Sequence, residues 1–242
     1  NTTASYNVGI GDGALGTNST GAYNTAVGKD ALAANTTGGN NIAIGAYALD
    51  ANTDKSSIVA IGNNALSANT TGMVNTAVGH SVLAQNTDGD NNVGMGYDAL
   101  NANTTADNNT GIGTQALTSN TTGVSNTAVG RSALQANTTG QSNVAVGTFA
   151  LDANTTASYN VAIGRNAMTN ATTAVGNTAV GYQAMSSGTQ GDYGVAIGHN
   201  ALYTNTGDSN TAVGENALQA NTSGTNNTAI GRGALDVNTT GA

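Results

Sequence analysis

The chain has 242 residues, of which only 7% are charged and 34 are glycine, while proline, cysteine and tryptophan are absent. Thirteen acidic residues against five basic ones give a net charge of −8, which argues against nucleic-acid binding because phosphate contacts need clustered lysine and arginine. Without cysteine there are no disulfides or thiolate metal sites, and no apolar run reaches the ~20 residues of a membrane-spanning helix, so we expect no membrane insertion.

A 17-residue period runs along the whole chain. The glycine that follows each aliphatic pair recurs in 17-residue steps from Gly11 to Gly198, then after 16 residues at Gly214 and after 17 at Gly231. Written from Asn24, the unit is N-T-A-V-G-x-x-A-L-x-A-N-T-T-G-x-x, and its positions are numbered one to seventeen. Such a short unit fits one coil of a parallel β-solenoid. We therefore predict an all-β fold, a single β-solenoid domain over residues 1–242 with about fourteen 17-residue coils. The 16-residue step falls in a turn, at Asn205 to Gly207.

Two strands are predicted in each coil. The first, residues 24–27 in the reference unit, alternates and is rich in β-branched side chains, and the second, residues 31–34, carries Leu32. Position four is always aliphatic, position nine is always Leu or Met, and position two is Thr, Val or Ile. We expect all three positions to face the core.

Two stripes of small residues accompany these strands. Position three is only Ala or Gly, and position eight is Ala except at Val82. Strand alternation places both opposite the expected core positions. We interpret them as an inter-chain packing stripe that docks a neighbouring chain; the alternative is that they lie inside a coil too thin for larger side chains. The stripe comprises Ala26, Ala31, Ala43, Ala48, Ala60, Ala65, Ala77, Ala128, Ala133 and Ala145.

Asparagine and threonine recur at the turn of positions twelve and thirteen. Asn tolerates left-handed backbone, and stacked amides can bond to one another from coil to coil. We predict such a ladder from Asn18, Asn35, Thr36, Asn52, Thr53, Asn69, Thr70, Asn86, Asn103, Asn120, Asn137 and Asn154. The same corner creates N-x-S/T sequons, an alternative use as N-glycosylation sites, at Asn18, Asn35, Asn69, Asn103, Asn120, Asn137, Asn154 and Asn221.

No recurring pattern points to catalysis. His80 and His199 both occupy position six but are seven coils apart, too far to share a metal, and no carboxylate pair recurs at fixed positions. We expect no enzyme activity and no cofactor.

The N-T-A-V-G core, with variants at residues 41–45 and 160–164, resembles the head repeat of YadA-like trimeric autotransporter adhesins. The longer form ending in N-T-T-G is similar to repeats of phage tail-fibre-like and bacterial surface proteins. The resemblance implies a left-handed parallel β-roll in which three chains pack side by side, although the 17-residue period is longer than that of the adhesin heads.

We therefore expect an extracellular fibre segment at a cell or virion surface: an adhesin head, a tail-fibre shaft or a filament protomer. Its expected partner is itself, as a homotrimer or a head-to-tail filament, and host or surface glycans are further candidates. The alternative from a different class is an ice-binding solenoid that uses its Thr ladders.

Overall fold

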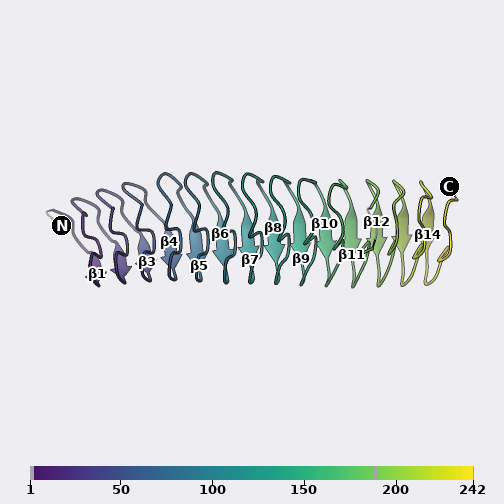
Figure 1. The fold of residues 1–242 in the computed structure, drawn as a ribbon, viewed down its shortest axis with the longest axis horizontal. Helices are drawn as coiled ribbons and strands as arrows, with labels where there is room; N and C mark the ends of the chain where they lie inside the picture. The colour runs from purple at the N-terminus through teal and green to yellow at the C-terminus, as the bar shows by residue number, and fades with distance from the viewer. Residues whose placement is uncertain (1–2, 188–189, 242) are drawn as a thin grey trace. The chain divides into compact units, whose positions relative to one another are not determined.

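The computed structural model describes residues 3–187 and 190–241, and it is all-β, which confirms the predicted parallel β-solenoid. Every strand occupies positions two to four of a repeat (Figure 1). The described strands are β1 (Val8–Ile10), β2 (Thr25–Val27), β3 (Ile42–Ile44), β4 (Val59–Ile61), β5 (Thr76–Val78), β6 (Val93–Met95), β7 (Thr110–Ile112), β8 (Thr127–Val129), β9 (Val144–Val146), β10 (Val161–Ile163), β11 (Thr178–Val180), β12 (Val195–Ile197), β13 (Thr211–Val213) and β14 (Thr228–Ile230).

The chain divides into two compact units, Asn1–Val124 with β1 to β7 and Ser125–Ala242 with β8 to β14. Within each unit every strand pairs in parallel with the next, in a register shifted by one repeat, as in Val8↔Thr25. The 16-residue step keeps this register, because Val195 still pairs with Thr211. The missing residue is therefore absorbed in the turn, as predicted. The single domain over residues 1–242 stays a prediction.

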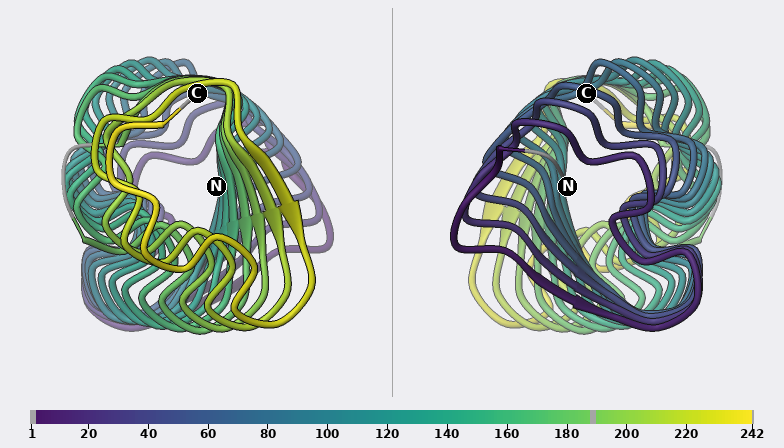
Figure 2. Two further views of the ribbon diagram at one scale, coloured as in Figure 1. Left: turned by 90° about the vertical axis from the view of Figure 1, so that its right-hand side faces the viewer. Right: turned by 90° about the vertical axis from the view of Figure 1, so that its left-hand side faces the viewer.

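Among the residues that the structure describes, each coil forms a single strand. Seen along the stack, the strands of each unit lie on one side of the coils and fan out from coil to coil, and the remaining residues close each coil as turns (Figure 2). The second predicted strand, residues 31–34, is wrong: Ala31 N–H donates to the Gly28 carbonyl at 3.4 Å and Asn35 N–H donates to the Leu32 carbonyl at 3.3 Å, which closes two successive turns. Neighbouring coils stay linked here, since Leu32 N–H donates to the Ala48 carbonyl at 2.9 Å.

Position nine has left-handed backbone, which explains its restricted sequence. Leu32 has a φ of 53°, and Met168 has a φ of 52° at the same position of its coil. A β-branched side chain is a strong outlier in this region, whereas Leu and Met, which are not branched at Cβ, occur there in every coil. Position nine therefore accepts Leu and Met but never Val or Ile. As expected, its side chain fills the core, and Leu32 is fully buried.

The strands face the opposite way from the sequence prediction. Position three is the inward side chain and positions two and four point outward: Ala43 is 0% exposed, while Ile42 and Ile44 on either side are each 38% exposed. The physical reason is the thinness of the coil, because position three lies directly against the Leu of position nine. A Cβ added at Gly111 would come within 3.0 Å of Leu100 Cγ, so only Ala or Gly fits.

The alanines interpreted as an inter-chain docking stripe are interior residues, so that interpretation is wrong and the thin-coil alternative describes the structure. Each is 0% exposed: Ala26, Ala31, Ala43, Ala48, Ala60, Ala65, Ala77, Ala128, Ala133 and Ala145. A compensating pair demonstrates their packing. Val82 is the one larger residue at position eight, and position three of the next coil is then Gly94, where a Cβ would lie 2.4 Å from Val82 Cγ1.

Among the described residues, no helix is long and apolar enough to cross a membrane.

Candidate interaction surfaces

The Asn residues of position twelve form a hydrogen-bonded ladder inside the coil. Asn86 Nδ2 donates to Asn69 Oδ1 at 2.9 Å, and Asn103 Nδ2 donates to Asn86 Oδ1 at 2.8 Å. The same arrangement joins Asn18 to Asn35, Asn35 to Asn52, Asn103 to Asn120, and Asn137 to Asn154. Each amide also closes its own turn, as Asn86 Nδ2 does on the Gly89 carbonyl at 3.0 Å.

A second asparagine ladder stands at position one. Asn24 Nδ2 donates to the Gly38 carbonyl at 2.8 Å, and Asn24 Oδ1 accepts the backbone N–H of Asn41 at 3.0 Å. Asn35 Nδ2, from position twelve, donates to the same Gly38 carbonyl at 3.0 Å. Two buried amides thus converge on one turn carbonyl, and this pairing satisfies polar groups that would otherwise be costly to bury.

This burial argues against glycosylation of the folded coil. The eight sequon residues Asn18, Asn35, Asn69, Asn103, Asn120, Asn137, Asn154 and Asn221 are at most 1% exposed. A glycan on Nδ2 would have to leave the interior and would replace a hydrogen that the turn uses. The sequons therefore follow from turn chemistry, and their interpretation as glycan sites does not fit the folded structure.

The threonines of position thirteen lie outside the coil, and their hydroxyls are engaged. Thr36 Oγ1 donates to the Thr53 carbonyl at 2.9 Å, and Thr70 Oγ1 donates to the Thr87 carbonyl at 3.2 Å. Thr53 Oγ1 is 3.5 Å from Asp54 Oδ1. The Thr36 and Thr70 hydroxyls tie neighbouring coils together, so their hydrogens are already used within the fold.

The outward side of the strands is an uncharged face, which we call the strand face. Its members occupy positions two and four, and positions four are aliphatic throughout, as in Ile44 at 38% and Met95 at 45% exposure. Position two is Thr in seven of fourteen coils and Val or Ile in the other seven. None of the chain's acidic or basic residues occupies either position. The strand face is therefore uncharged, and it is apolar apart from one broken column of hydroxyls.

A different edge of the coils carries the basic residues. Four of the five Lys and Arg residues and both histidines occupy position six, immediately after the strand and its glycine. Each histidine stacks on a tyrosine, His80 on Tyr97 and His199 on Tyr182, both with ring centroids 5.4 Å apart. Lys29 Nζ donates to Tyr47 Oη at 2.8 Å, a bond that raises the pKa of Lys29.

Two carboxylates at position ten are partly desolvated. Burial raises the pKa of Asp50 and of Asp152, and in each residue Oδ1 is buried without a hydrogen-bond partner. They lie six repeats apart in the sequence. Within residues 3–187 and 190–241 there is no pocket and no group of three His, Asp or Glu side chains arranged around a common point.

The strand face and the basic edge were both missed from the sequence, although signals for them exist. The absence of charge at positions two and four marks the strand face, and the concentration of four of the five Lys and Arg residues at position six marks the edge. Comparison with known proteins finds no match among family models, curated proteins or solved structures.

Proposed function

We propose that this chain is a structural fibre segment that assembles with copies of itself through the strand face. The observation that carries the proposal is an outward row of β-branched side chains, in register from coil to coil and free of charge. Apolar faces that stay exposed on a soluble chain mark interaction sites. A fibre at a cell or virion surface, as an adhesin head, a tail-fibre shaft or a filament protomer, uses such a face to hold parallel chains together.

The area of the strand face fits a second copy of the chain. Strands ~4.8 Å apart and three residues long give about 340 Å² for seven strands, and so about 670 Å² for the two units of one chain. A stable interface buries about 800 Å² on each partner. The charge of −8 resides entirely at other positions, so two strand faces can meet without direct like-charge contact. The homotrimer that the resemblance implies would bring three strand faces to a common axis, whereas a head-to-tail filament would join the ends of the coil stacks instead.

Sedimentation equilibrium tests the proposal. The wild-type chain of 23.6 kDa is expected to associate. A Val78→Lys/Ile112→Lys variant places two charges on the strand face and is expected to sediment as a monomer, because each lysine would be desolvated in the interface. The matched control, Asn63→Lys/Thr114→Lys, adds the same charges at exposed position-six sites and should associate like the wild type. A monomeric wild-type chain, or a strand-face variant that still associates, rejects the proposal.

Ice binding is the second candidate, and the observation that favours it is the outward column of threonines at position two. This column is interrupted by Val or Ile in half of the coils, and the other Thr ladder has its hydroxyls bonded to carbonyls. A broken column gives a poor match to a lattice, which is why self-association is preferred. A thermal hysteresis measurement decides between the two functions. Thermal hysteresis by the wild-type chain, in a solution dilute enough for the chain to be monomeric, would favour ice binding.

A further inference from the structure

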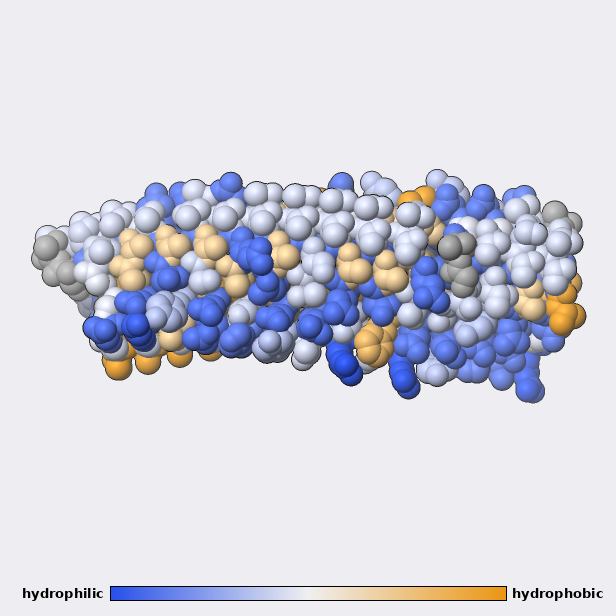
Figure 3. All heavy atoms as spheres, viewed as in Figure 1, coloured by the Kyte–Doolittle hydropathy of each residue, from blue (hydrophilic) through white to orange (hydrophobic). Residues whose placement is uncertain are grey.

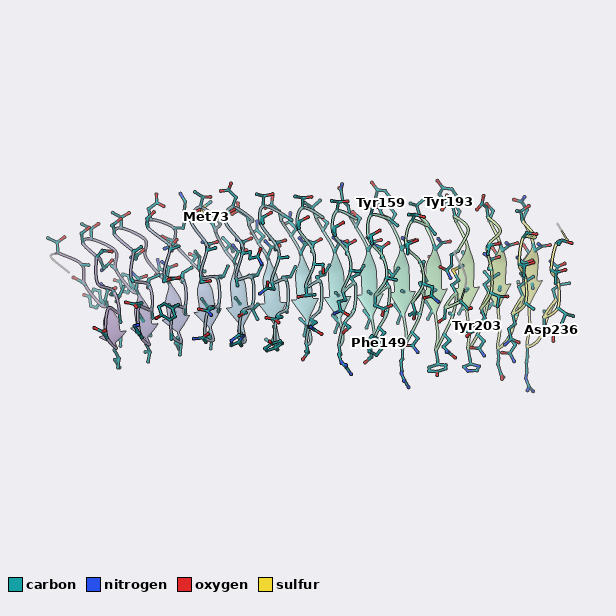
Figure 4. The ribbon with its side chains drawn as sticks, in the orientation of Figure 1. Met73, Phe149, Tyr159, Tyr193, Tyr203 and Asp236 are labelled. Carbon is teal, nitrogen blue, oxygen red and sulfur yellow. The ribbon has the colours of Figure 1, made fainter. Side chains whose placement is uncertain are left out.

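The basic residues of the second unit follow a regular spacing. Position six carries Arg131, Arg165, His199 and Arg232, one in every second coil. Aromatic rings occupy two of the coils between them, Phe149 at position seven and Tyr182 at position six. We call these six residues the basic ridge. Figure 4 shows Phe149 at the lower edge of the coils, away from Tyr159 and Tyr193 at the upper edge, and hydrophilic side chains project beyond that lower edge in Figure 3.

Contacts along the ridge hold the cations in place. The guanidinium carbon of Arg131 lies 5.2 Å from the Phe149 ring centroid, and that of Arg165 lies 5.9 Å from the Tyr182 centroid. Tyr182 in turn stacks on His199 with an interplanar angle of 11°. A guanidinium held against a ring keeps its N–H edges available, so less rotamer freedom is lost when it binds an anion.

Arg131 and Arg165 are exposed and have no carboxylate partner in the part of the chain that the structure describes. Arg232 differs, because its Nε lies 3.2 Å from Glu215 Oε2. The surrounding charge is mild: residues 125–242 contain three basic and five acidic residues, a net charge of −2 out of the −8 of the whole chain. Two acidic residues of this unit, Asp192 and Asp208, accept backbone N–H groups at position sixteen, in another turn.

We propose that the basic ridge binds an acidic polysaccharide, through carboxylate or sulfate groups on Arg131 and Arg165. Cations in every second coil are ~9.6 Å apart at the strand spacing. A nucleic-acid strand carries one phosphate per ~3.4 Å, so most of its charges would find no partner on this ridge. A polysaccharide with one anionic group per two sugars has charges set farther apart, which suits the sparse ridge. Planar guanidinium groups bind carboxylate and sulfate oxygens with two parallel hydrogen bonds.

The experiment measures binding of the 242-residue chain at low salt to two probes that carry one anionic group per two sugars, hyaluronate with carboxylates and κ-carrageenan with sulfates, with uncharged dextran and an oligo-dT strand for comparison. We expect both acidic polymers to bind and added salt to weaken them. Arg165→Gln should lower affinity about three- to fivefold, the size of one exposed charge contact. The Arg131→Gln/Arg165→Gln variant should lose most binding.

The matched control is Lys55→Gln, which removes one positive charge at a turn outside the ridge, where Lys55 Nζ lies 3.3 Å from Asp54 Oδ1. It should bind like the wild type. Both arginines are exposed, so far-UV circular dichroism should be unchanged in their variants. The proposal is overturned if neither acidic polymer binds, if the double variant binds as tightly as the wild type, if Lys55→Gln loses as much affinity as Arg165→Gln, or if oligo-dT binds more tightly than the acidic polymers. Strand-face association plays no part in this test.

Discussion

Replacing Asn86 with alanine removes one rung from the middle of the position-twelve ladder. Asn86 is 0% exposed, donates to Asn69 Oδ1 and to the Gly89 carbonyl, and accepts from Asn103 Nδ2. The Gly89 carbonyl keeps a donor, because Asn75 Nδ2 reaches it at 2.7 Å. Asn103 Nδ2 keeps one acceptor, the Ala106 carbonyl at 3.0 Å. The substitution therefore orphans two buried groups: Asn69 Oδ1 and one hydrogen of the Asn103 amide.

Each orphaned polar group costs about 1–3 kcal/mol, so Asn86→Ala, which orphans two, should lower the free energy of unfolding by about 2–6 kcal/mol. With a urea dependence of roughly 2 kcal/mol per molar, the unfolding midpoint should fall by about 1 M or more. Far-UV circular dichroism in urea measures this shift. Because coils are stabilised by their neighbours, the transition should also broaden as the first unit loses its central support.

Asn63→Ala is the matched control, since Asn63 is exposed at position six of the same unit. It should change the free energy of unfolding by no more than about 0.5 kcal/mol. Equal urea midpoints for Asn86→Ala and Asn63→Ala would refute the reasoning, because the ladder would then contribute no stability.

Three further changes should raise stability. Val74→Asn should raise Tm by about 2–4 °C, because Val74 is a β-branched residue with a φ of 56° and its side chain is 56% exposed. Asn91 occupies the same position of the next coil with the same φ, and asparagine tolerates this backbone. An unchanged or lower Tm in a thermal melt would contradict this prediction. Ala171→Asn should add about 1 kcal/mol in urea unfolding, by supplying a donor to Asn154 Oδ1, which is buried without a partner; a loss of stability would show that this coil cannot hold the amide. Asp152→Asn should stabilise the chain at about pH 7, because burial raises the folded-state pKa of Asp152 and the charged carboxylate therefore destabilises the fold at a pH above that pKa. This gain in stability should disappear below about pH 3.9, where the wild-type carboxyl is protonated in both the folded and the unfolded state. A gain that stays constant across pH would contradict desolvation of the carboxylate as its cause.

The period and the position of the strand in each repeat could be predicted from the sequence, but which side chains of that strand face the core could not. Alternation defines two faces without saying which is inside, and the usual preference for buried Val and Ile pointed to the wrong one. The decisive signal was a single coil in which a larger residue at position eight, Val82, is accompanied by Gly94 in place of alanine. That pair indicates direct packing, and the other coils give no such signal because position eight is alanine in all of them.

The prediction of a second strand in each coil was wrong for a different reason. Strand propensity says nothing about left-handed backbone at a leucine, and Leu32 has a φ of 53°. The absence of Val and Ile at position nine was the available signal. The Asn ladder followed from repetition alone, whereas its burial, which decides against the glycan interpretation, depends on how the turn folds around Asn35 and the Gly38 carbonyl.

The measurement that tests the account most directly is thiol labelling of single-cysteine variants, which is clean because the chain has no cysteine of its own. Thr76→Cys lies on the strand face, Ala77→Cys lies inside the coil, and Asn63→Cys is an exposed control. We expect the Thr76→Cys thiol to react in dilute solution and to be protected when the chain associates at high concentration, the Ala77→Cys thiol to be unreactive in both, and the Asn63→Cys thiol to react in both. A Thr76→Cys thiol that reacts equally at every concentration would contradict assembly through the strand face, and a reactive Ala77→Cys thiol beside an unreactive Thr76→Cys thiol would contradict the facing of the strands.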